Sequence, residues 1–355
     1  MMRMNKTERE YAMKLMKTED AVGQVLCHDI TQIIKGVTKD ARFRKGHIIG
    51  EEDIPVLLSI GKDHIYVWEN DETMMHENEA AEVLCAICKG ENMSRGEVKE
   101  GKIELRAECD GVFKIDRAKL RAVNSFGQMM IASRHGDFQV KKGDKLAGTR
   151  IIPLVIEKEK MEQVRALAGD EPIMKVVPYK PHKAGIVTTG NEVFYGRIED
   201  TFTPVVKAKV EYFGAEVIAH KITNDENENI EKCIRELLDE GCDMILCTGG
   251  MSVDPDDKTP LAIRNVAGSV VTYGAPVLPG AMFLLAYYGE NKIPVMGLPG
   301  CVMYARRTIF DIVLPRIMTG EILTKDDFDC LGEGGFCLNC EICTFPDCGF
   351  GKGGY

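Results

Sequence analysis

The chain has 355 residues, enough for two domains that each bury a core. With 45% hydrophobic and 28% charged residues, its composition is that of a globular protein rather than a disordered or fibrous one. The formal net charge of −10 argues against a nucleic-acid partner, because phosphate backbones are held by lysine and arginine. A small anionic ligand is not excluded, since a metal ion or helix N-termini can supply local positive potential.

The start of the chain is charged and lacks a continuous apolar core, so we expect no signal peptide. The apolar run at 281–288 is far shorter than the ~20 residues that a membrane-spanning helix needs. The sequence therefore predicts a cytoplasmic protein that does not enter a membrane.

Residues 1–180 predict a β-rich α+β region. Within it, the apolar spacing at 54–61 predicts a short amphipathic helix leading into a strand at 64–68. The stretch 157–167 predicts a charged helix, and the two prolines of 178–183 (PYKPHK) indicate a linker.

From residue 184 the pattern changes to a regular alternation of strands and helices. The apolar segments that predict strands are 184–189, 215–222, 243–248 and 292–298. Amphipathic helices between such strands predict an α/β fold, with a mostly parallel sheet covered on both faces, over residues 181–322. A final helix is expected from Cys301, kinked or ended by Pro315.

Polar and glycine-rich residues follow these strands at their C-terminal ends. Ligands of doubly wound sheets bind at this edge, where glycines let backbone N–H groups approach a phosphate. The residues concerned are Thr189, Gly190, Asn191, Glu192, Asn224, Asp225, Thr248, Gly249, Gly250, Leu298, Pro299 and Gly300.

Acidic side chains belong to the same loops. Glu192, Asp225, Asp256 and Asp257 would share one cleft if the strands are neighbours. Carboxylates beside phosphates are typical of Mg²⁺ sites, in which one or two protein oxygens act with phosphate oxygens and water. We therefore expect Mg²⁺ here, with Asp225 and Asp257 as its ligands.

The segments TTGNEV, ITND, CTGGMSVDPDDKTP, VLPG and GLPG occur in this order over about 135 residues. This series resembles the domain shared by molybdopterin adenylyltransferases and molybdopterin molybdenumtransferases. The resemblance implies that molybdopterin binds here and that Glu192, Asp225 and Asp257 form the catalytic acidic site. The cofactor-binding residues that it implies are Thr189, Gly190, Thr248, Gly249, Gly250, Ser252, Pro279, Gly280, Pro299 and Gly300.

Residues 21–70 weakly resemble the N-terminal region of the molybdenumtransferases. The leading hypothesis is therefore Mg²⁺-dependent insertion of molybdate into adenylylated molybdopterin, with release of AMP. The expected partners are molybdopterin, molybdate, molybdoenzymes or other cofactor-synthesis proteins, and a second copy of the chain in a homo-oligomer.

Three departures from the family pattern keep two alternatives open. Leu278 and Ala281 flank Pro279-Gly280 where the family has lysines, Cys301 stands where it has Asn, and Phe202 replaces the Asn of its Asp-Ser-Asn. These changes favour a non-catalytic molybdopterin carrier or redox sensor. The third hypothesis is the adenylyltransferase reaction.

Five of the 13 cysteines crowd residues 323–355, the cysteine-rich tail. Cys337, Cys340, Cys343 and Cys348 lie within twelve residues, and two-residue spacing lets thiolates converge on one centre. The tail predicts an Fe–S cluster or a zinc ion, with Fe–S favoured; the alternatives are a redox-active thiol tail and an inert, disordered one. Cys85 and Cys88, in an apolar helical stretch, are expected in the core instead.

Overall fold

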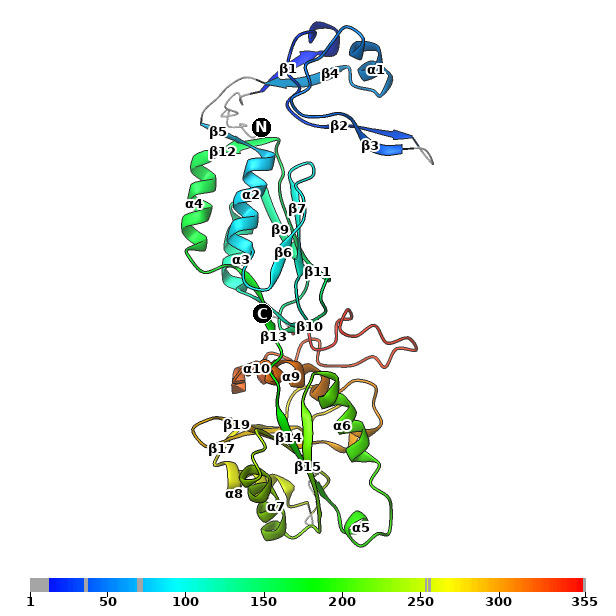
Figure 1. Cartoon of the computed structure of the whole chain (residues 1–355), viewed down its shortest axis with the longest axis vertical. Helices are drawn as coiled ribbons and strands as arrows, with labels where there is room; N and C mark the ends of the chain where they lie inside the picture. The colour runs from blue at the N-terminus through cyan, green and yellow to red at the C-terminus, as the bar shows by residue number, and fades with distance from the viewer. Residues whose placement is uncertain (1–12, 35–37, 69–72, 253, 255–256, 354–355) are drawn as a thin grey trace, which may run out of the picture. The chain divides into compact units, whose positions relative to one another are not determined.

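The computed structural model describes residues 13–34, 38–68, 73–252, 254 and 257–353 (Figure 1). They fall into two compact units. The segments of unit 1 lie within Met1–Glu108, Ile115–Arg134 and Gly143–Lys175, and those of unit 2 within Cys109–Lys114, His135–Lys142 and Val176–Tyr355.

Unit 1 begins with a small β-rich module. Two antiparallel strand pairs and one helix enclose its own apolar cluster, which includes Leu26, Ile49 and Leu57. The elements are β1 (Met13–Lys17), β2 (Ile30–Ile34), β3 (Thr38–Phe43), α1 (Asp53–Ser59) and β4 (His64–Trp68). The predicted helix and following strand are thus confirmed as α1 and β4.

The rest of unit 1 is an antiparallel sheet with three helices. Its strand order is β6-β7-β11-β9, and the short strands β5 and β12 pair separately. The bounds are β5 (Met74–His76), α2 (Glu77–Cys88), β6 (Met93–Arg95), β7 (Lys102–Ala107), α3 (Arg117–Ser125), β9 (Met129–Ser133), β11 (Lys145–Ile151), β12 (Val155–Glu157) and α4 (Lys158–Ala168). Cys85 and Cys88 are buried on α2, as expected.

Unit 2 contains a six-stranded sheet of order β15-β14-β16-β19-β18-β17. The first four strands are parallel, and the last two form an antiparallel edge. The strands are β14 (Lys183–Thr189), β15 (Glu216–Thr223), β16 (Met244–Thr248), β17 (Ser269–Tyr273), β18 (Leu284–Tyr288) and β19 (Ile293–Leu298). The predicted mostly parallel α/β sheet is confirmed; β17 and β18 are additional strands that the sequence pattern did not reveal.

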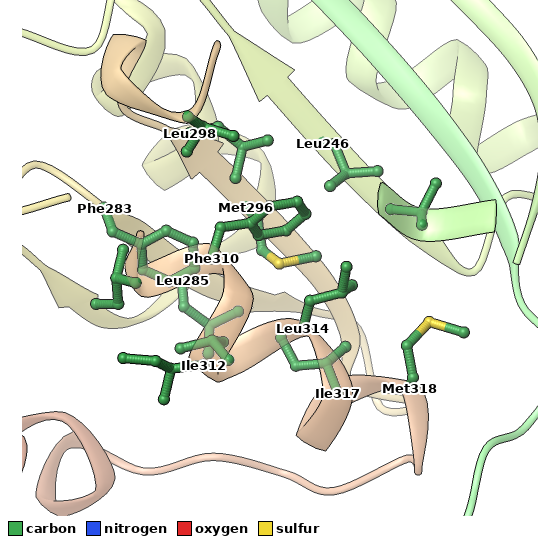
Figure 2. Close-up of a cluster of buried hydrophobic side chains, with 14 of the residues drawn as sticks. Leu246, Phe283, Leu285, Met296, Leu298, Phe310, Ile312, Leu314, Ile317 and Met318 are labelled. Atoms are coloured by element: carbon green, nitrogen blue, oxygen red, sulfur yellow. The ribbon is translucent and has the colours of Figure 1, made fainter. Parts of the chain in front are cut away.

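Helices cover both faces of this sheet because strand side chains alternate between two apolar clusters. Ile186 and Leu246 face α6 and α9, whereas Val187 and Ile245 face α7 and α8. The helices are α5 (Asn191–Phe194), α6 (Phe202–Tyr212), α7 (Asn227–Asp239), α8 (Thr259–Ala267) and α9 (Ile309–Met318). Figure 2 shows the first cluster, in which Phe310 and Leu314 lie beside Met296. Within the described ranges, no helix is long and apolar enough to cross a bilayer.

Helix α9 is the buried centre of this first cluster. It begins at Ile309, where Thr308 and Asp311 form a capping box, rather than at Cys301, which lies in the short 3₁₀ helix η2 (Gly300–Met303). Of the two outcomes expected at Pro315, the end of the helix is wrong, because the helix continues to Met318 with the proline inside it; a kink stays a prediction. Burial of every residue of α9 compensates for the hydrogen bond that proline cannot donate.

The tail packs into the same unit. Helix α10 (Lys325–Asp329) buries Phe328, and Arg316 of α9 forms ion pairs with Glu321 and with Asp327 of α10. Farther along, Phe345 and Phe350 are buried in the cluster that contains α9. A three-stranded sheet of order β10-β8-β13 (Phe138–Val140, Gly111–Ile115, Met174–Pro178) completes the fold, and β10 packs on α9.

Candidate functional site at the carboxyl edge of the sheet

The carboxyl ends of the parallel strands meet in register. Thr189 pairs with Thr223 of β15, Thr188 pairs with Thr248 of β16, and Thr248 pairs with Leu298 of β19. The loops that follow these strands therefore lie at one edge. Strands β15 and β16 lie on opposite sides of β14, and the chain runs from β14 to β15 and then crosses over to β16. The switch point of the topology therefore falls between Gly190 and Gly249.

Three glycines shape this switch point. Gly190, Gly249 and Gly250 have φ angles of +132°, +84° and +54°, a region that L side chains rarely adopt. A Cβ at Gly250 would lie 2.8 Å from Thr259 Oγ1 and 3.2 Å from Thr189 Oγ1, and one at Gly249 would overlap the carbonyl oxygen of Thr189. Any side chain at 249 or 250 would therefore disturb the loop itself, even before a ligand is considered.

The three acids of the predicted catalytic site occupy different loops of the edge. Asp225 Oδ2 accepts a hydrogen bond of 2.8 Å from the backbone N–H of Asn191, which fixes the carboxylate beside the start of α5. Glu192, exposed on α5, folds back until Oε1 is 2.8 Å from the position of a Cβ on Gly190. Asp257 Oδ1 lies 3.7 Å from the equivalent position on Gly250, just before α8. Asp256 lies outside the described residues.

Tyr273, at the end of β17, also belongs to the edge. Its hydroxyl donates to the carbonyl oxygens of Met251 and Ser252 at 3.3 Å, which ties β17 to the loop after β16. Burial, together with the negative charge of Asp257, raises the pKa of Tyr273. No motif contains this tyrosine, and sequence reasoning missed it because β17 itself was not recognised.

A polar network on the α6 side of the edge was also missed. Thr188 Oγ1 donates to Asp200 Oδ2 at 3.2 Å and lies 2.9 Å from His220 Nε2. Asp200 also accepts from the backbone N–H groups of Phe202 and Thr203 at the start of α6. Burial would raise the pKa of Asp200, but these hydrogen bonds outweigh it and hold that pKa below its ordinary value. Burial lowers the pKa of His220.

The described carboxylates of this edge are of the kind that binds Mg²⁺, but they are not gathered closely enough to hold it by themselves. Asp225 and Asp257 offer hard carboxylate oxygens at the same edge as the N-termini of α7 and α8. Across the described residues, no three His, Cys, Asp or Glu side chains are gathered closely enough to hold a metal ion by themselves. A divalent cation at this edge would therefore need ligand phosphate oxygens as part of its coordination shell, which is the usual situation for Mg²⁺.

The two proline–glycine turns differ in their surroundings. Gly280 is buried, and a Cβ there would lie 2.5 Å from Ile309 Cγ2, while the carbonyl of Pro279 accepts from the N–H of Ile309. These residues have a packing role against α9, and their predicted contact with ligand stays a prediction. Gly300, after buried Pro299, is exposed, has no positive φ, and has no described heavy atom within 4 Å of a Cβ position. Gly300 is thus open to a ligand.

The four clustered cysteines of the tail are placed together. Cys337, Cys340, Cys343 and Cys348 all line one cavity of about 270 Å³. Cys330 follows α10 and does not line it.

Two parts of the chain match known protein families. Residues 185–319 match the family described as "Probable molybdopterin binding domain", and residues 15–69 match a family described as a domain of unknown function. The second match covers the small module of β1 to β4.

Curated relatives share part of the chain. A "CinA-like protein" of Mycobacterium avium is 34% identical over 95 residues, covering 27% of this chain, and one of Mycobacterium tuberculosis is 33% identical over 86 residues, covering 24%. These matches span only 22% and 20% of the relatives' own lengths.

Among solved structures, the molybdopterin biosynthesis enzyme MoaB of Thermus thermophilus is 28% identical, with 39% of this chain and 98% of that chain covered and a TM-score of 0.34. The tungsten cofactor synthesizing protein MoaB of Pyrococcus furiosus is 19% identical, with 40% and 92% covered and a TM-score of 0.32. By its sequence match, the segment 185–319 is a domain of the molybdopterin-binding type found in molybdenum cofactor biosynthesis.

Proposed function

We propose that unit 2 binds adenylylated molybdopterin at the carboxyl edge of its sheet and inserts molybdate with release of AMP. The observation that carries the proposal is the switch point itself, where Gly249 lies against the carbonyl of Thr189 and where Asp225 and Asp257 stand in the adjoining loops. This arrangement combines a glycine-lined approach for phosphates with carboxylates for a divalent cation.

Each group of the edge has a separate part in the proposed reaction. The N-termini of α7 and α8 point their positive dipole ends at the edge and would attract the phosphates. Asp225, fixed by Asn191, and Asp257 would hold Mg²⁺, and Glu192 would orient it. A bound Mg²⁺ would offset the charge that develops on the phosphates as the phosphoanhydride is cleaved.

The loop after β16 would then fix the position of the pterin phosphate relative to these acids. Tyr273 holds this loop through the carbonyls of Met251 and Ser252. Exposed Gly300 leaves room for a ligand on the β19 side of the switch point. The ends of the parallel strands fix where the loops of this edge begin, which suits positioning of a phosphoanhydride.

The test is to incubate the purified full chain with adenylylated molybdopterin, Mg²⁺ and molybdate and to measure AMP by chromatography. Release of AMP that depends on both Mg²⁺ and molybdate is expected. A parallel incubation of molybdopterin with ATP and Mg²⁺ detects the adenylyltransferase reaction as formation of adenylylated pterin, which would contradict the proposal if it were the only turnover found.

A second candidate is a non-catalytic molybdopterin carrier. It is favoured by the connection between β17 and β18, where Leu278 and Ala281 stand in place of the family's lysines and Leu278 is hydrogen-bonded to Gly335 of the tail. A carrier would bind molybdopterin in equilibrium dialysis and release no AMP in either incubation. Failure to bind the pterin at all would exclude both candidates.

A further inference from the structure

The tail forms a cavity rather than an extended arm. Its volume is about 270 Å³, and the lining contains the four cysteines at 337, 340, 343 and 348 together with Arg306 and Arg307. Aromatic rings of Phe336, Phe345 and Phe350 complete much of the wall. Four thiols, two cations and a largely apolar wall thus enclose a single space.

Both ends of the cysteine-bearing loop are fixed to the α/β part of unit 2. At one end the N–H of Leu278 donates to the carbonyl of Gly335, and the N–H of Cys337 donates back to the carbonyl of Leu278, both at 2.8 Å. At the other end Phe345 and Phe350 are buried in the cluster of α9. These contacts fix both ends of the loop to unit 2.

Arg306 fixes the middle of the loop. Its Nη1 donates to the carbonyl oxygens of Cys340, at 3.2 Å, and Glu341, at 2.7 Å. The neighbouring Arg307 stacks its guanidinium 5.1 Å from the ring centre of Phe345. Beyond these contacts the loop faces solvent, since the side chain of Ile342 is 79% exposed. A group that enters from solvent can thus reach the cysteines.

Zinc and an iron–sulfur cluster differ in how closely they need their thiolates. A zinc ion needs its sulfurs about 2.3 Å away on all sides, so its four thiolates crowd together. Within the part of the chain that the structure describes, no three His, Cys, Asp or Glu side chains form a group that could hold a single metal ion. A [4Fe–4S] cluster has an iron at each of four corners and takes one thiolate per iron, so its ligands stand farther apart around a larger body.

We propose that the tail cavity binds a [4Fe–4S] cluster through Cys337, Cys340, Cys343 and Cys348. The cluster with four thiolates carries a net negative charge, which the guanidinium groups of Arg306 and Arg307 offset. The buried rings of Phe345 and Phe350 shield one side of the cavity from water, which slows loss of the cluster. This inference does not rest on the proposed function, because it concerns other residues and another ligand.

The experiment uses the full chain, purified and reconstituted without oxygen with ferric iron, sulfide and a thiol, which reduces part of the iron during assembly. We expect a brown protein with about four iron and four acid-labile sulfide per chain. On reduction its colour should bleach, and the reduced cluster should give an electron paramagnetic resonance signal. A colourless protein that retains zinc after this treatment, or a protein with neither metal, overturns the proposal.

Variants identify the ligands. Cys340→Ser and Cys343→Ser change exposed loop positions and should lower the bound iron at least several-fold while circular dichroism stays that of the parent. Cys330→Ser is the matched control, because this cysteine belongs to the tail but does not line the cavity. Iron retained in both loop variants, or lost equally in the control, overturns the assignment of the four ligands.

Discussion

The carbonyl oxygen of Thr189 occupies the space in which a side chain on Gly249 would lie. Thr189 ends β14 and Gly249 directly follows β16, so the approach of one strand end to the other depends on this glycine. Because Gly249 also has a φ of +84°, the position combines a steric demand with a conformational one.

Gly249→Ala should therefore destabilise unit 2 more than a substitution that meets only the conformational demand. Gly268, at the C-terminus of α8, has a φ of +73° but no described heavy atom within 4 Å of a Cβ position. We expect Gly268→Ala to cost about 1 kcal/mol and Gly249→Ala about 3 kcal/mol or more.

Hydrogen exchange of peptides from β14 and β16 measures this difference. The single tryptophan, Trp68, lies in unit 1, so its fluorescence does not report on unit 2. Equal losses of protection in the two variants would show that the close contact with Thr189 is relaxed at little cost.

A substitution at Gly300 tests whether the ligand approaches the backbone here, because a side chain at this position causes no backbone strain. Gly300→Val places a side chain in open space, so hydrogen exchange protection should stay that of the parent. If the pterin phosphate approaches the backbone here, its affinity should fall at least tenfold in equilibrium dialysis. Unchanged affinity in a folded Gly300→Val variant would move the ligand away from the end of β19.

Asp257→Asn should abolish most Mg²⁺-dependent AMP release and spare much of the pterin affinity, because an amide keeps the shape but is a poorer Mg²⁺ ligand. Asp239→Asn removes the same charge at the exposed C-terminal end of α7, which lies toward the opposite edge of the sheet, and serves as control. Initial rates of AMP formation across a Mg²⁺ titration decide the matter. Parent-like rates in Asp257→Asn would leave the metal to Asp225 and other groups.

The network of Asp200 and His220 predicts a dependence of stability on pH. The pKa of Asp200 is lowered in the folded state, so its contribution is present at neutral pH and is lost as the pH falls through the acidic range below about 4. The pKa of His220 is also lowered, so folding favours the neutral ring, and stability falls as the pH drops below about 6.5. Both groups therefore make unit 2 less stable in acid.

Two variants separate these pH windows. His220→Gln should flatten the decline that begins below about pH 6.5, and Asp200→Asn should flatten the decline below about pH 4. Thermal unfolding followed by circular dichroism across this pH range measures both effects. A parent-like profile in His220→Gln would show that its imidazole titrates as it does in the unfolded chain.

The α/β sheet could be predicted because its signals are local. Apolar strands such as 243–248 and helices with one apolar face identify themselves within a few residues, and glycines at the strand ends mark the ligand edge. Strand β18 escaped because 281–288 is a continuous apolar run, which periodicity alone cannot assign to a strand or a helix. That the helix continues past Pro315 could not be predicted for a related reason, since burial of α9 is a tertiary effect.

The candidate site was predictable only where motifs carry it. Asp225 and Asp257 stand in recognisable segments, whereas Tyr273, Thr188 and His220 acquire their partners through strand pairing between distant parts of the chain. The tail shows the same division. Spacing of its cysteines was visible in the sequence, but the contribution of Arg306 depends on a contact across 34 residues.

The burial of Phe345 and Phe350 against α9 has a consequence for limited proteolysis. A protease should cut the exposed stretch at 338–344 while the segments on either side stay attached to unit 2. Removal of everything after residue 322 would instead uncover Ile312, whose Cδ1 would lie 2.6 Å from a Cβ on Gly351. It would also leave Phe310 and its neighbours exposed to water. The smallest fragment of unit 2 that stays in solution should therefore extend to Gly353.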